Sequence, residues 1–301
     1  MKTIDTLVED IQGLFGEAQK GRGHTFDLDV LASFGTSIAT HMANAVAART
    51  WKRPPNTLRM SEAGKPCIRQ LWYQVNEPSK AEEMQSHTLF KFVYGNMIEE
   101  ATLLLAEAAG HKVELRQHEV ELNVNGWRVV GHLDAVIDGV LVDVKSCSPF
   151  GYKKFKEGLT PANDSFGYIT QLSGYNLGLS SIGRRQGFLA VDKQNGHVGY
   201  FDSAYDKHVE HRLKATVLLM SASIKDIPRT YKLEPEGTSG NMKLPMECSY
   251  CPFKHECWKD ANDGEGLRTF WYSHGPVYLA VVKKEPKVLE IKPATSLGTP
   301  T

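Results

Sequence analysis

The sequence predicts an α/β fold in which a mixed β-sheet is flanked by helices. Three stretches support this prediction. A meander of strands occupies residues 120–146, and an Ala- and Leu-rich helix precedes it at 89–109. A second helix follows at 165–179, and two further strands, at 186–191 and 197–201, are expected to extend the sheet. Strands that alternate with helices along a chain are typical of a sheet covered by those helices.

Two dipeptides, Asn125-Gly126 and Asp138-Gly139, divide the central stretch into strands. Both dipeptides favour two-residue hairpin turns, because such turns need positive φ at two adjacent residues. Segments 127–137 and 140–146 are then neighbouring strands of a three-stranded antiparallel meander.

The second turn determines which residues face each other. A two-residue turn at Asp138-Gly139 places Asp134 opposite Asp143 and His132 opposite Lys145. Side chains alternate along a strand, so Asp143 and Lys145 share one face. The other face is aliphatic and consists of Val140, Val142 and Val144. Two carboxylates that face each other across strands destabilise the pair unless a positive charge compensates them.

This pair of carboxylates predicts a divalent-cation site. Oxygen ligands suit Mg²⁺ or Mn²⁺, which keep part of their shell for water and substrate phosphates. Lys145 adds a positive charge and a proton donor beside the ion. The alternative is a solvated strand face with incidental acids. The register set by the turn and the aliphatic opposite face favour the metal site.

The segments Gly131-His-Leu-Asp134 and Asp143-Val-Lys145 resemble the signature of the PD-(D/E)XK nucleases, in their RecB-like branch. The resemblance implies a restriction-endonuclease-like core and metal-dependent hydrolysis of DNA phosphodiester bonds. It implies that Asp134, Asp143 and the Val144 carbonyl bind Mg²⁺ or Mn²⁺, which lowers the pKa of a bound water. Lys145 would orient that water or the transition-state oxygens. The resemblance also implies exonuclease action, often 5′→3′ on single strands, in recombination, repair or end processing.

The helix at 89–109 ends before Gly110 and carries a candidate third acidic ligand. Glu99 lies on the apolar stripe of this helix, where a carboxylate needs a partner. The RecB-like pattern has Gly-x-x-x-His here, whereas this chain has Gly95-x-x-x-Glu99, which is similar to phage recombination exonucleases. The resemblance therefore implies that Glu99 binds the metal. Glu100 is an alternative, and so is an ordinary surface glutamate.

Two segments that follow the strand could contact DNA. Residues 150–156 mix lysines with aromatic side chains, which suits single-stranded DNA, although a solvated loop explains them equally well. The helix at 165–179 carries Gln171 and Tyr175, four residues apart and therefore on one face. A Gln-x-x-x-Tyr helix follows the Asp-x-Lys strand in the RecB-like family. The resemblance implies that Gln171 and Tyr175 position the scissile strand.

The cysteines predict a second metal site. Cys248, Cys251 and Cys257 lie close together in the sequence, and two cysteines separated by two residues can present thiolates to one metal. Five cysteines, an odd number, favour metal ligation in a reducing compartment over a disulfide framework. Structural zinc would take these three with Cys67 or His255, whereas an iron–sulfur cluster would take Cys67.

The setting of Cys67, in Cys-x-Arg-x-Leu-x-Tyr, together with the C-terminal triplet resembles the iron-staple nucleases. These include AddB-type helicase–nucleases and CRISPR-adaptation exonucleases. The resemblance favours a 4Fe-4S cluster over zinc. Cys147 fits neither ligand set and is expected to be structural.

Composition sets further limits. The 301 residues are 41 % hydrophobic and 23 % charged, as expected for a soluble globular protein. We expect a cytoplasmic location, because no apolar run approaches a membrane span and the N-terminus lacks a signal core. Lys plus Arg and Asp plus Glu number 35 each, so any DNA-binding surface must be local.

The expected organisation has three parts: a helical accessory region at 1–60, the nuclease domain with its cysteine staple at 61–262, and a strand pair with a tail at 263–301. DNA is the expected partner, and a recombination protein is a further candidate; the sequence does not specify the oligomeric state. Two rival functions stay open. One is a DNA-binding scaffold that does not cleave, and the other is a zinc-stabilised endonuclease.

Overall fold

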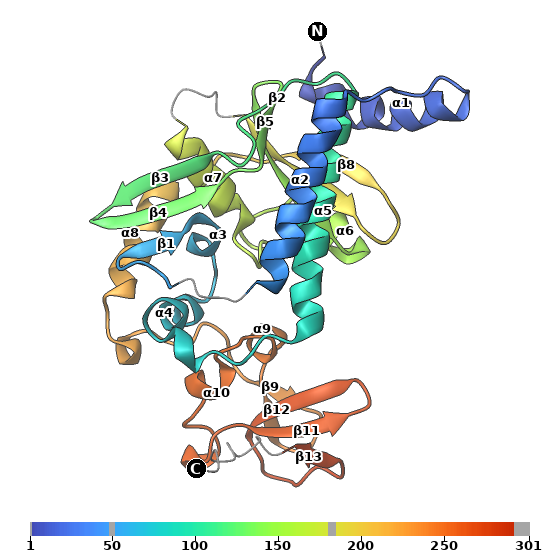
Figure 1. Ribbon diagram of the computed structural model, residues 1–301. Helices are drawn as coiled ribbons and strands as arrows, with labels where there is room; N and C mark the ends of the chain where they lie inside the picture. The colour runs from blue at the N-terminus through green and yellow to red at the C-terminus, as the bar shows by residue number, and fades with distance from the viewer. Residues whose placement is uncertain (1, 48–51, 180–184, 292–301) are drawn as a thin grey trace, which may run out of the picture. The chain divides into compact units, whose positions relative to one another are not determined.

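The computed structural model describes residues 2–47, 52–179 and 185–291. The chain forms two compact units (Figure 1). The first unit comprises residues 1–66 and 85–218, and the second comprises 67–84 and 219–301. The chain therefore enters the second unit, leaves it to build most of the first, and returns. These units cut across the expected segments 1–60, 61–262 and 263–301.

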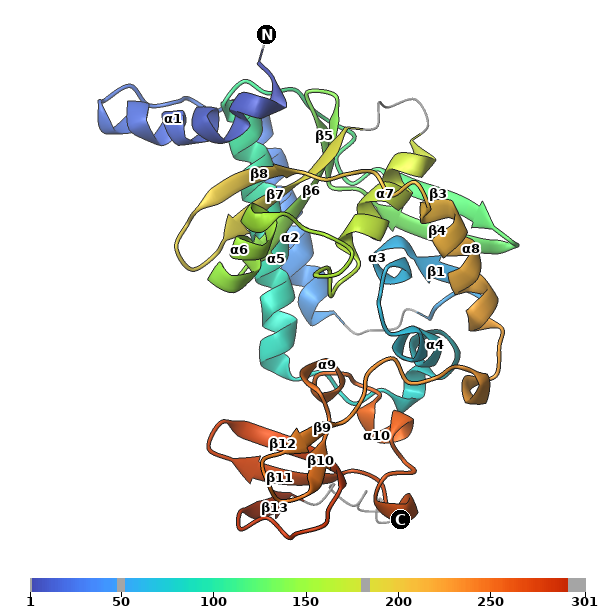
Figure 2. The same cartoon turned by 180° about the vertical axis from the view of Figure 1, so that it is seen from behind.

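A mixed five-stranded sheet forms the core of the first unit, as the sequence predicts. Its strands, in spatial order, are β2 (Val113–Glu114), β5 (Ala135–Ile137), β6 (Val140–Cys147), β7 (Gln186–Asp192) and β8 (Val198–Asp202). Only β6 and β7 pair in parallel; the other neighbours are antiparallel. A parallel pair needs a long crossover. Here the crossover contains α6 (Pro149–Glu157) and α7 (Tyr168–Gly178), both labelled in Figure 2.

The aliphatic face of β6 is buried against helices. Val140, Val142 and Val144 pack in one hydrophobic cluster with Leu103 and Ala106 of α5 (Ser86–Ala108). The N-terminal segment adds Ile4, and α1 (Leu7–Gln19) adds Leu7 and Ile11. The face that the alternation assigns to valines is therefore the core face, and residues near the N-terminus help to bury it.

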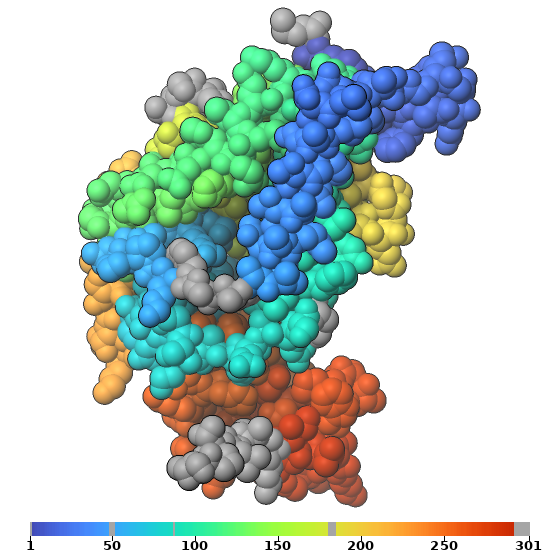
Figure 3. Space-filling model, in the orientation of Figure 1, coloured from blue at the N-terminus to red at the C-terminus, as the bar shows by residue number. Residues whose placement is uncertain are grey.

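The helix α2 (Leu28–Val46) buries none of its residues. It lies along α5, and its outer side forms an uncovered surface in Figure 3. The sequence predicts this helix from Leu31 to Arg49; the predicted end lies outside the described residues.

Both predicted hairpin turns are present. Asn125 and Gly126 have φ of 51° and 79°, and Asp138 and Gly139 have φ of 50° and 80°. The second turn gives the predicted register, because Ala135 pairs with Val142 and Ile137 with Val140.

The predicted single strand at 127–137 is wrong, because the chain changes sheets in its middle. The first half is β4 (Trp127–His132), which joins β3 (Glu119–Val124) and β1 (Thr57–Arg59) in a separate three-stranded sheet. His132 consequently pairs with Glu119, and the predicted pairing with Lys145 is wrong. The Leu133 N–H donates to the His118 carbonyl, and the Asp134 carbonyl accepts from the Gln117 N–H. Residues 133 and 134 therefore bond to the segment before β3, and the pairing with β6 begins only at Ala135.

The remaining helices of the first unit are short or differ slightly from expectation. The four-residue helix α3 (Met60–Ala63) follows β1. The helix predicted at 165–179 begins later, as α7, because Asp164 accepts hydrogen bonds from the N–H groups of Phe166, Gly167 and Tyr168. The last helix, α8 (Val209–Met220), runs to the point where the chain passes into the second unit.

The second unit combines short helices with an antiparallel sheet. The helices are α4 (Ile68–Asn76), α9 (Met246–Ser249) and α10 (Lys254–Cys257). The sheet has the order β13 (Leu289–Ile291), β11 (Arg268–Tyr272), β12 (Gly275–Val281), β10 (Asn241–Lys243) and β9 (Glu234–Glu236). The strand pair expected at 270–272 and 277–282 is thus confirmed as β11 and β12. The expected tail from Pro293 lies outside the described residues.

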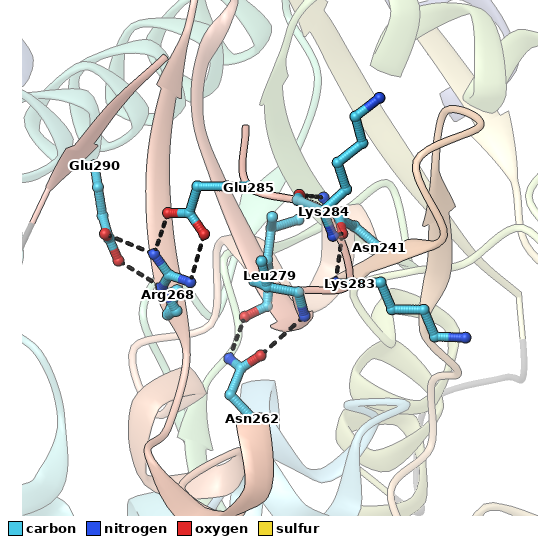
Figure 4. A network of polar contacts seen from close by, with 9 residues as sticks. Asn241, Asn262, Arg268, Leu279, Lys283, Lys284, Glu285 and Glu290 are labelled. Atoms are coloured by element: carbon cyan, nitrogen blue, oxygen red, sulfur yellow. Dashed lines mark hydrogen bonds and ion pairs between the residues drawn. The ribbon is translucent and has the colours of Figure 1, made fainter. Parts of the chain in front are cut away.

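Polar side chains fasten the loops of this sheet (Figure 4). The Arg268 guanidinium donates to Glu285 at 3.1 Å and to Glu290 at 2.7 Å. The buried Asn241 accepts from the Lys283 N–H at 2.7 Å and donates to the Lys284 carbonyl at 2.8 Å. Because a buried amide must satisfy its donors and acceptors, Asn241 fixes the path of the chain after β12.

None of the helices in the described ranges combines the length and the apolar character that a membrane crossing requires.

Candidate active site

Asp143 and Lys145 lie next to each other on β6, opposite its core face. Lys145 Nζ is 2.5 Å from Asp143 Oδ2, and the Asp143 side chain is only 2 % exposed. Within the described residues no donor is aligned to hydrogen-bond with Asp143 Oδ2 despite this short ion-pair distance. Gln171 Nε2, on α7, lies 3.5 Å from the other carboxylate oxygen, Oδ1. Gln171, which the sequence assigns to positioning the scissile strand, therefore lies beside the acid of β6.

Asp134 lies at the change of sheets, just before β5. Its Oδ2 accepts a hydrogen bond from the Val144 N–H at 2.6 Å, across the two strands. Burial raises its pKa well above the ordinary value, and the negative charges of Asp143 and Glu99 raise it further. The predicted closeness of Asp134 to the Asp143 strand is thus present. The Val144 carbonyl, predicted as a ligand, belongs to the residue whose N–H donates to Asp134.

Glu99 reaches this group of acids from α5. Burial and the nearby charges of Asp143 and Glu100 raise its pKa to about 7. Its Oε1 accepts a hydrogen bond from Gln117 Nε2 at 2.5 Å. Gln117 is a residue that sequence reasoning missed, because it lies in an irregular loop and belongs to no recognised motif.

Glu100 has a different environment. It is 4 % exposed and forms an ion pair with Arg116 at 2.6 Å, and His41 Nε2 lies 3.5 Å away. Arg116 already compensates the charge of Glu100. Of the two neighbouring glutamates, Glu99 is therefore the better candidate ligand at this site.

Tyr168, at the start of α7, is a second residue that the sequence analysis missed. Lys145 Nζ lies 4.6 Å from the centre of its ring, which is favourable for a cation–π contact. Burial alone would lower the pKa of Lys145, but the charges of Asp143 and Asp134 outweigh it and raise that pKa. Lys145 is therefore a permanently charged group at neutral pH.

Tyr175 is buried one turn after Gln171, with 3 % exposure. Burial and the nearby Asp143 raise its pKa, while a hydrogen bond with Gln171 opposes the shift. A Cβ added to Gly131 would lie 2.6 Å from the Tyr175 hydroxyl, so this position in β4 admits no side chain without a shift. Tyr175 consequently packs between the two sheets of the first unit and supports Gln171.

The residue types at this site fit a divalent cation. Three acids, Glu99, Asp134 and Asp143, surround one lysine, and an oxygen of Asp143 lacks an aligned donor. A cation would compensate these neighbouring acids, and carboxylate oxygens suit Mg²⁺ or Mn²⁺. In the part of the chain that the structure describes, no three Asp, Glu, His or Cys side chains converge closely enough to enclose an ion as they stand.

The four predicted cysteine ligands gather in the second unit. Cys67, Cys248, Cys251 and Cys257 all line one small cavity. Burial, followed by the charges of the other three thiols, raises the pKa of Cys248 to about 12. Four neighbouring thiols can all be ionised only if a positive charge compensates them. This set of thiols therefore fits a metal ion or cluster. Among the described residues these thiols, as they stand, do not form a group that could enclose a metal ion.

His255, the alternative fourth ligand, and Cys147, which is expected to be structural, both lie outside the lining of this cavity. His255 Nε2 lies 3.3 Å from Glu82. Cys147 is on β6 in the first unit, where its Sγ donates to the Val191 carbonyl at 3.4 Å. Cys67 is therefore the fourth thiol of the cavity.

The sequence of the chain matches a known protein family. The sequence matches the family described as the PD-(D/E)XK nuclease superfamily over residues 11–258, most of the chain. No curated protein matches it. The crystal structure of SSO0001 is similar over 75 % of this chain and 95 % of its own, with 14 % identity and a TM-score of 0.43. An alkaline exonuclease from Laribacter hongkongensis (LHK-Exo) is similar over 56 % and 90 %, with 13 % identity and a TM-score of 0.39.

Proposed function

Because the chain belongs to the PD-(D/E)XK nuclease superfamily, we propose that it is a Mg²⁺- or Mn²⁺-dependent deoxyribonuclease of the RecB-like branch. The proposed reaction is exonucleolytic cleavage of single-stranded DNA or duplex ends, in the 5′→3′ direction, during recombination, repair or end processing. The observation that carries the proposal is the grouping of Glu99, Asp134 and Asp143 around Lys145.

Each side chain has a proposed role. Glu99, Asp134, Asp143 and the Val144 carbonyl would hold the cation, which when bound acidifies a water and offsets charge on the phosphate. Lys145 stays protonated because acids surround it, so it can donate a hydrogen bond to the attacking water or to a phosphate oxygen.

Gln171 and Tyr175 act one layer further out. Gln171 Nε2 approaches Asp143 Oδ1 and would orient that carboxylate or the scissile strand. Tyr175 is too buried to touch DNA in this structure, so its proposed role is to hold Gln171 in place.

We also propose that the cysteine cavity holds a 4Fe-4S cluster, with structural zinc as the alternative. The support is that four thiols line one cavity while His255 does not. The cluster would be structural, because its four ligands belong to the second unit and the acids belong to the first.

The decisive experiment uses end-labelled linear DNA, single- and double-stranded, with Mg²⁺, Mn²⁺ or EDTA, and a covalently closed circle. We expect the wild-type protein to degrade linear DNA with either metal, to be inactive in EDTA and to leave the circle intact. Asp143→Asn should abolish cleavage while the protein still unfolds in one cooperative thermal transition, which shows that it is folded. Glu9→Gln, an acid-to-amide change at an exposed residue of α1, is the control and should remain active.

Other outcomes select other functions. Cleavage of the circle would identify an endonuclease. Tight DNA binding without cleavage under any metal condition would identify the non-catalytic scaffold. Normal cleavage by Asp143→Asn with Mn²⁺ would contradict the assignment of this site.

A further inference from the structure

A row of stacked aromatic rings leads from the candidate active site to the surface. The ring of Tyr168 lies 4.6 Å from Lys145 Nζ. The ring of Phe166 stacks on Tyr168, with centroids 5.2 Å apart and an interplanar angle of 20°. Phe155 of α6 also lies nearly parallel to Tyr168, with centroids 6.1 Å apart. Phe155 is buried at 5 %, whereas Phe166 is 63 % exposed, so the row ends in an accessible aromatic ring.

The backbone under Phe166 is held rigidly. The carboxylate of Asp164, itself 8 % exposed, accepts hydrogen bonds from the N–H groups of Phe166, Gly167 and Tyr168, the shortest at 2.8 Å. Gly167 has φ of 79°, and a Cβ there would lie 2.1 Å from the Gly64 carbonyl oxygen. The loop between α6 and α7 (Figure 2) therefore presents Phe166 in a fixed position.

This combination differs from an ordinary exposed apolar side chain. Single exposed hydrophobic residues are common and need no explanation. Here the exposed ring is stacked nearly parallel to a second ring that contacts the proposed catalytic lysine, and a buried carboxylate fixes its loop. A flat, fixed, exposed ring is what a nucleic-acid base requires for stacking.

We infer that Phe166 is the stacking platform for one unpaired DNA base close to the scissile phosphate. The inference deepens the proposed nuclease function and rests on it. The ring lies within about 10 Å of Lys145 Nζ, through Tyr168. At about 3.4 Å per stacked nucleotide, that distance places the base within roughly three nucleotides of the cleaved bond.

The neighbouring charges suit the same ligand. The helix α6, whose Phe155 stacks on Tyr168, carries Lys153, Lys154 and Lys156, which can neutralise backbone phosphates. Only Glu157 opposes them on that helix, 3.5 Å from Lys153. A base inside a duplex is covered on both faces by its neighbours and cannot offer a face to the ring, so the platform predicts a preference for single strands.

The test compares protein and substrate changes in one cycle. The substrates are single-stranded oligonucleotides, each with one abasic site at successive positions from the cut bond. The variants are Phe166→Ala, Phe166→Leu and Phe166→Trp. The control is Phe15→Ala, because Phe15 is similarly exposed, at 57 %, but lies on α1. Thermal unfolding confirms that each variant folds.

We expect Phe166→Ala and Phe166→Leu to lower kcat/KM on intact single strands by about 5- to 140-fold, the range for loss of one base–aromatic stack. Phe166→Trp and Phe15→Ala should stay near wild type. One abasic position should cost the wild-type protein a similar factor and cost Phe166→Ala nothing further. Equal abasic penalties in both proteins at every position would overturn the inference.

A binding measurement separates this inference from the nuclease proposal. In EDTA, 2-aminopurine at the sensitive position should lose fluorescence on binding to wild-type protein and not on binding to Phe166→Ala. Such a result without any cleavage activity would keep the base platform and refute the nuclease function. Active cleavage with fluorescence that is independent of Phe166 would keep the nuclease function and refute the base platform.

Discussion

Glu99 and Glu100 are adjacent on α5, yet their surroundings are opposite. Glu99 faces Asp143 and has a pKa of about 7, whereas Glu100 is buried in an ion pair with Arg116. The sequence could not separate them, because their order along a helix does not reveal which acid receives a basic partner from a distant loop. The distinction depends on Arg116, which no motif indicated.

This contrast gives a prediction on metal binding and stability. Glu99→Gln should raise the Mn²⁺ concentration for half-maximal activity by roughly tenfold or more, because a ligand charge is lost. Glu100→Gln should instead lower the unfolding midpoint, because Arg116 loses the nearer of its two acidic partners, Glu100 and Glu107. Metal titration of activity and thermal unfolding measure the two effects. The reverse ranking would transfer the ligand role to Glu100.

The same prediction has a defined pH dependence. A carboxyl whose pKa is raised in the native state binds more protons there than in the unfolded chain. The metal-free protein therefore loses stability as pH rises from about 4.5 to about 7. Glu99→Gln removes this loss, so it should stabilise the metal-free protein at pH 8 and have little effect near pH 4.5. A pH-independent effect would contradict the raised pKa.

At the scale of elements, local signals were sufficient where neighbours in sequence are neighbours in space. Asn125-Gly126 and Asp138-Gly139 predicted both turns, and the turn at Asp138-Gly139 predicted the register of β5 with β6. The change of sheets at Asp134 was not predictable, because it depends on hydrogen bonds to Gln117 and His118. A continuous strand and a broken one have the same alternating pattern.

Two helical glycines give a matched prediction for α7 and α5. A Cβ at Gly174 would lie 2.3 Å from Met60 Sδ, whereas a Cβ at Gly95 would meet nothing within 4 Å. Gly174→Ala should therefore destabilise the protein by about 1–3 kcal/mol through overpacking. Gly95→Ala should stabilise it by roughly 0.5–1 kcal/mol through helix propensity. Chemical denaturation measures both, and equal effects would show that α7 can move away from α3.

At the scale of the whole molecule, the cysteine cavity connects two parts of the second unit that are far apart in the sequence. Cys67 begins the short segment 67–84 of the second unit, which interrupts the first unit, and the other three cysteines follow the return of the chain at residue 219. The sequence predicted the four ligands through their motif. It could not predict that the chain divides into units at residues 67, 85 and 219, because such limits follow from long-range packing.

The last prediction concerns this connection. Protein prepared without oxygen should be brown, and Cys251→Ser should bleach it, because one thiolate ligand is lost. The same variant should lower the unfolding midpoint. A bond that closes a loop of about 100 residues or more is worth roughly 5 kcal/mol, by analogy with a disulfide. Cys147→Ser is the matched control, because Cys147 lies on β6 in the first unit, and it should leave the colour unchanged.

Iron analysis and the absorption spectrum measure the cluster, and calorimetry measures stability. Asp143→Asn should keep the colour while it abolishes cleavage, because the acids and the thiols belong to different units. Colourless wild-type protein with one zinc per chain would show that the four thiols bind zinc and not a 4Fe-4S cluster. The proposed structural link between distant parts of the chain would remain. Bleaching by Cys147→Ser together with a brown Cys67→Ser variant would contradict the ligand set, because Cys67 is the fourth thiol that lines the cavity.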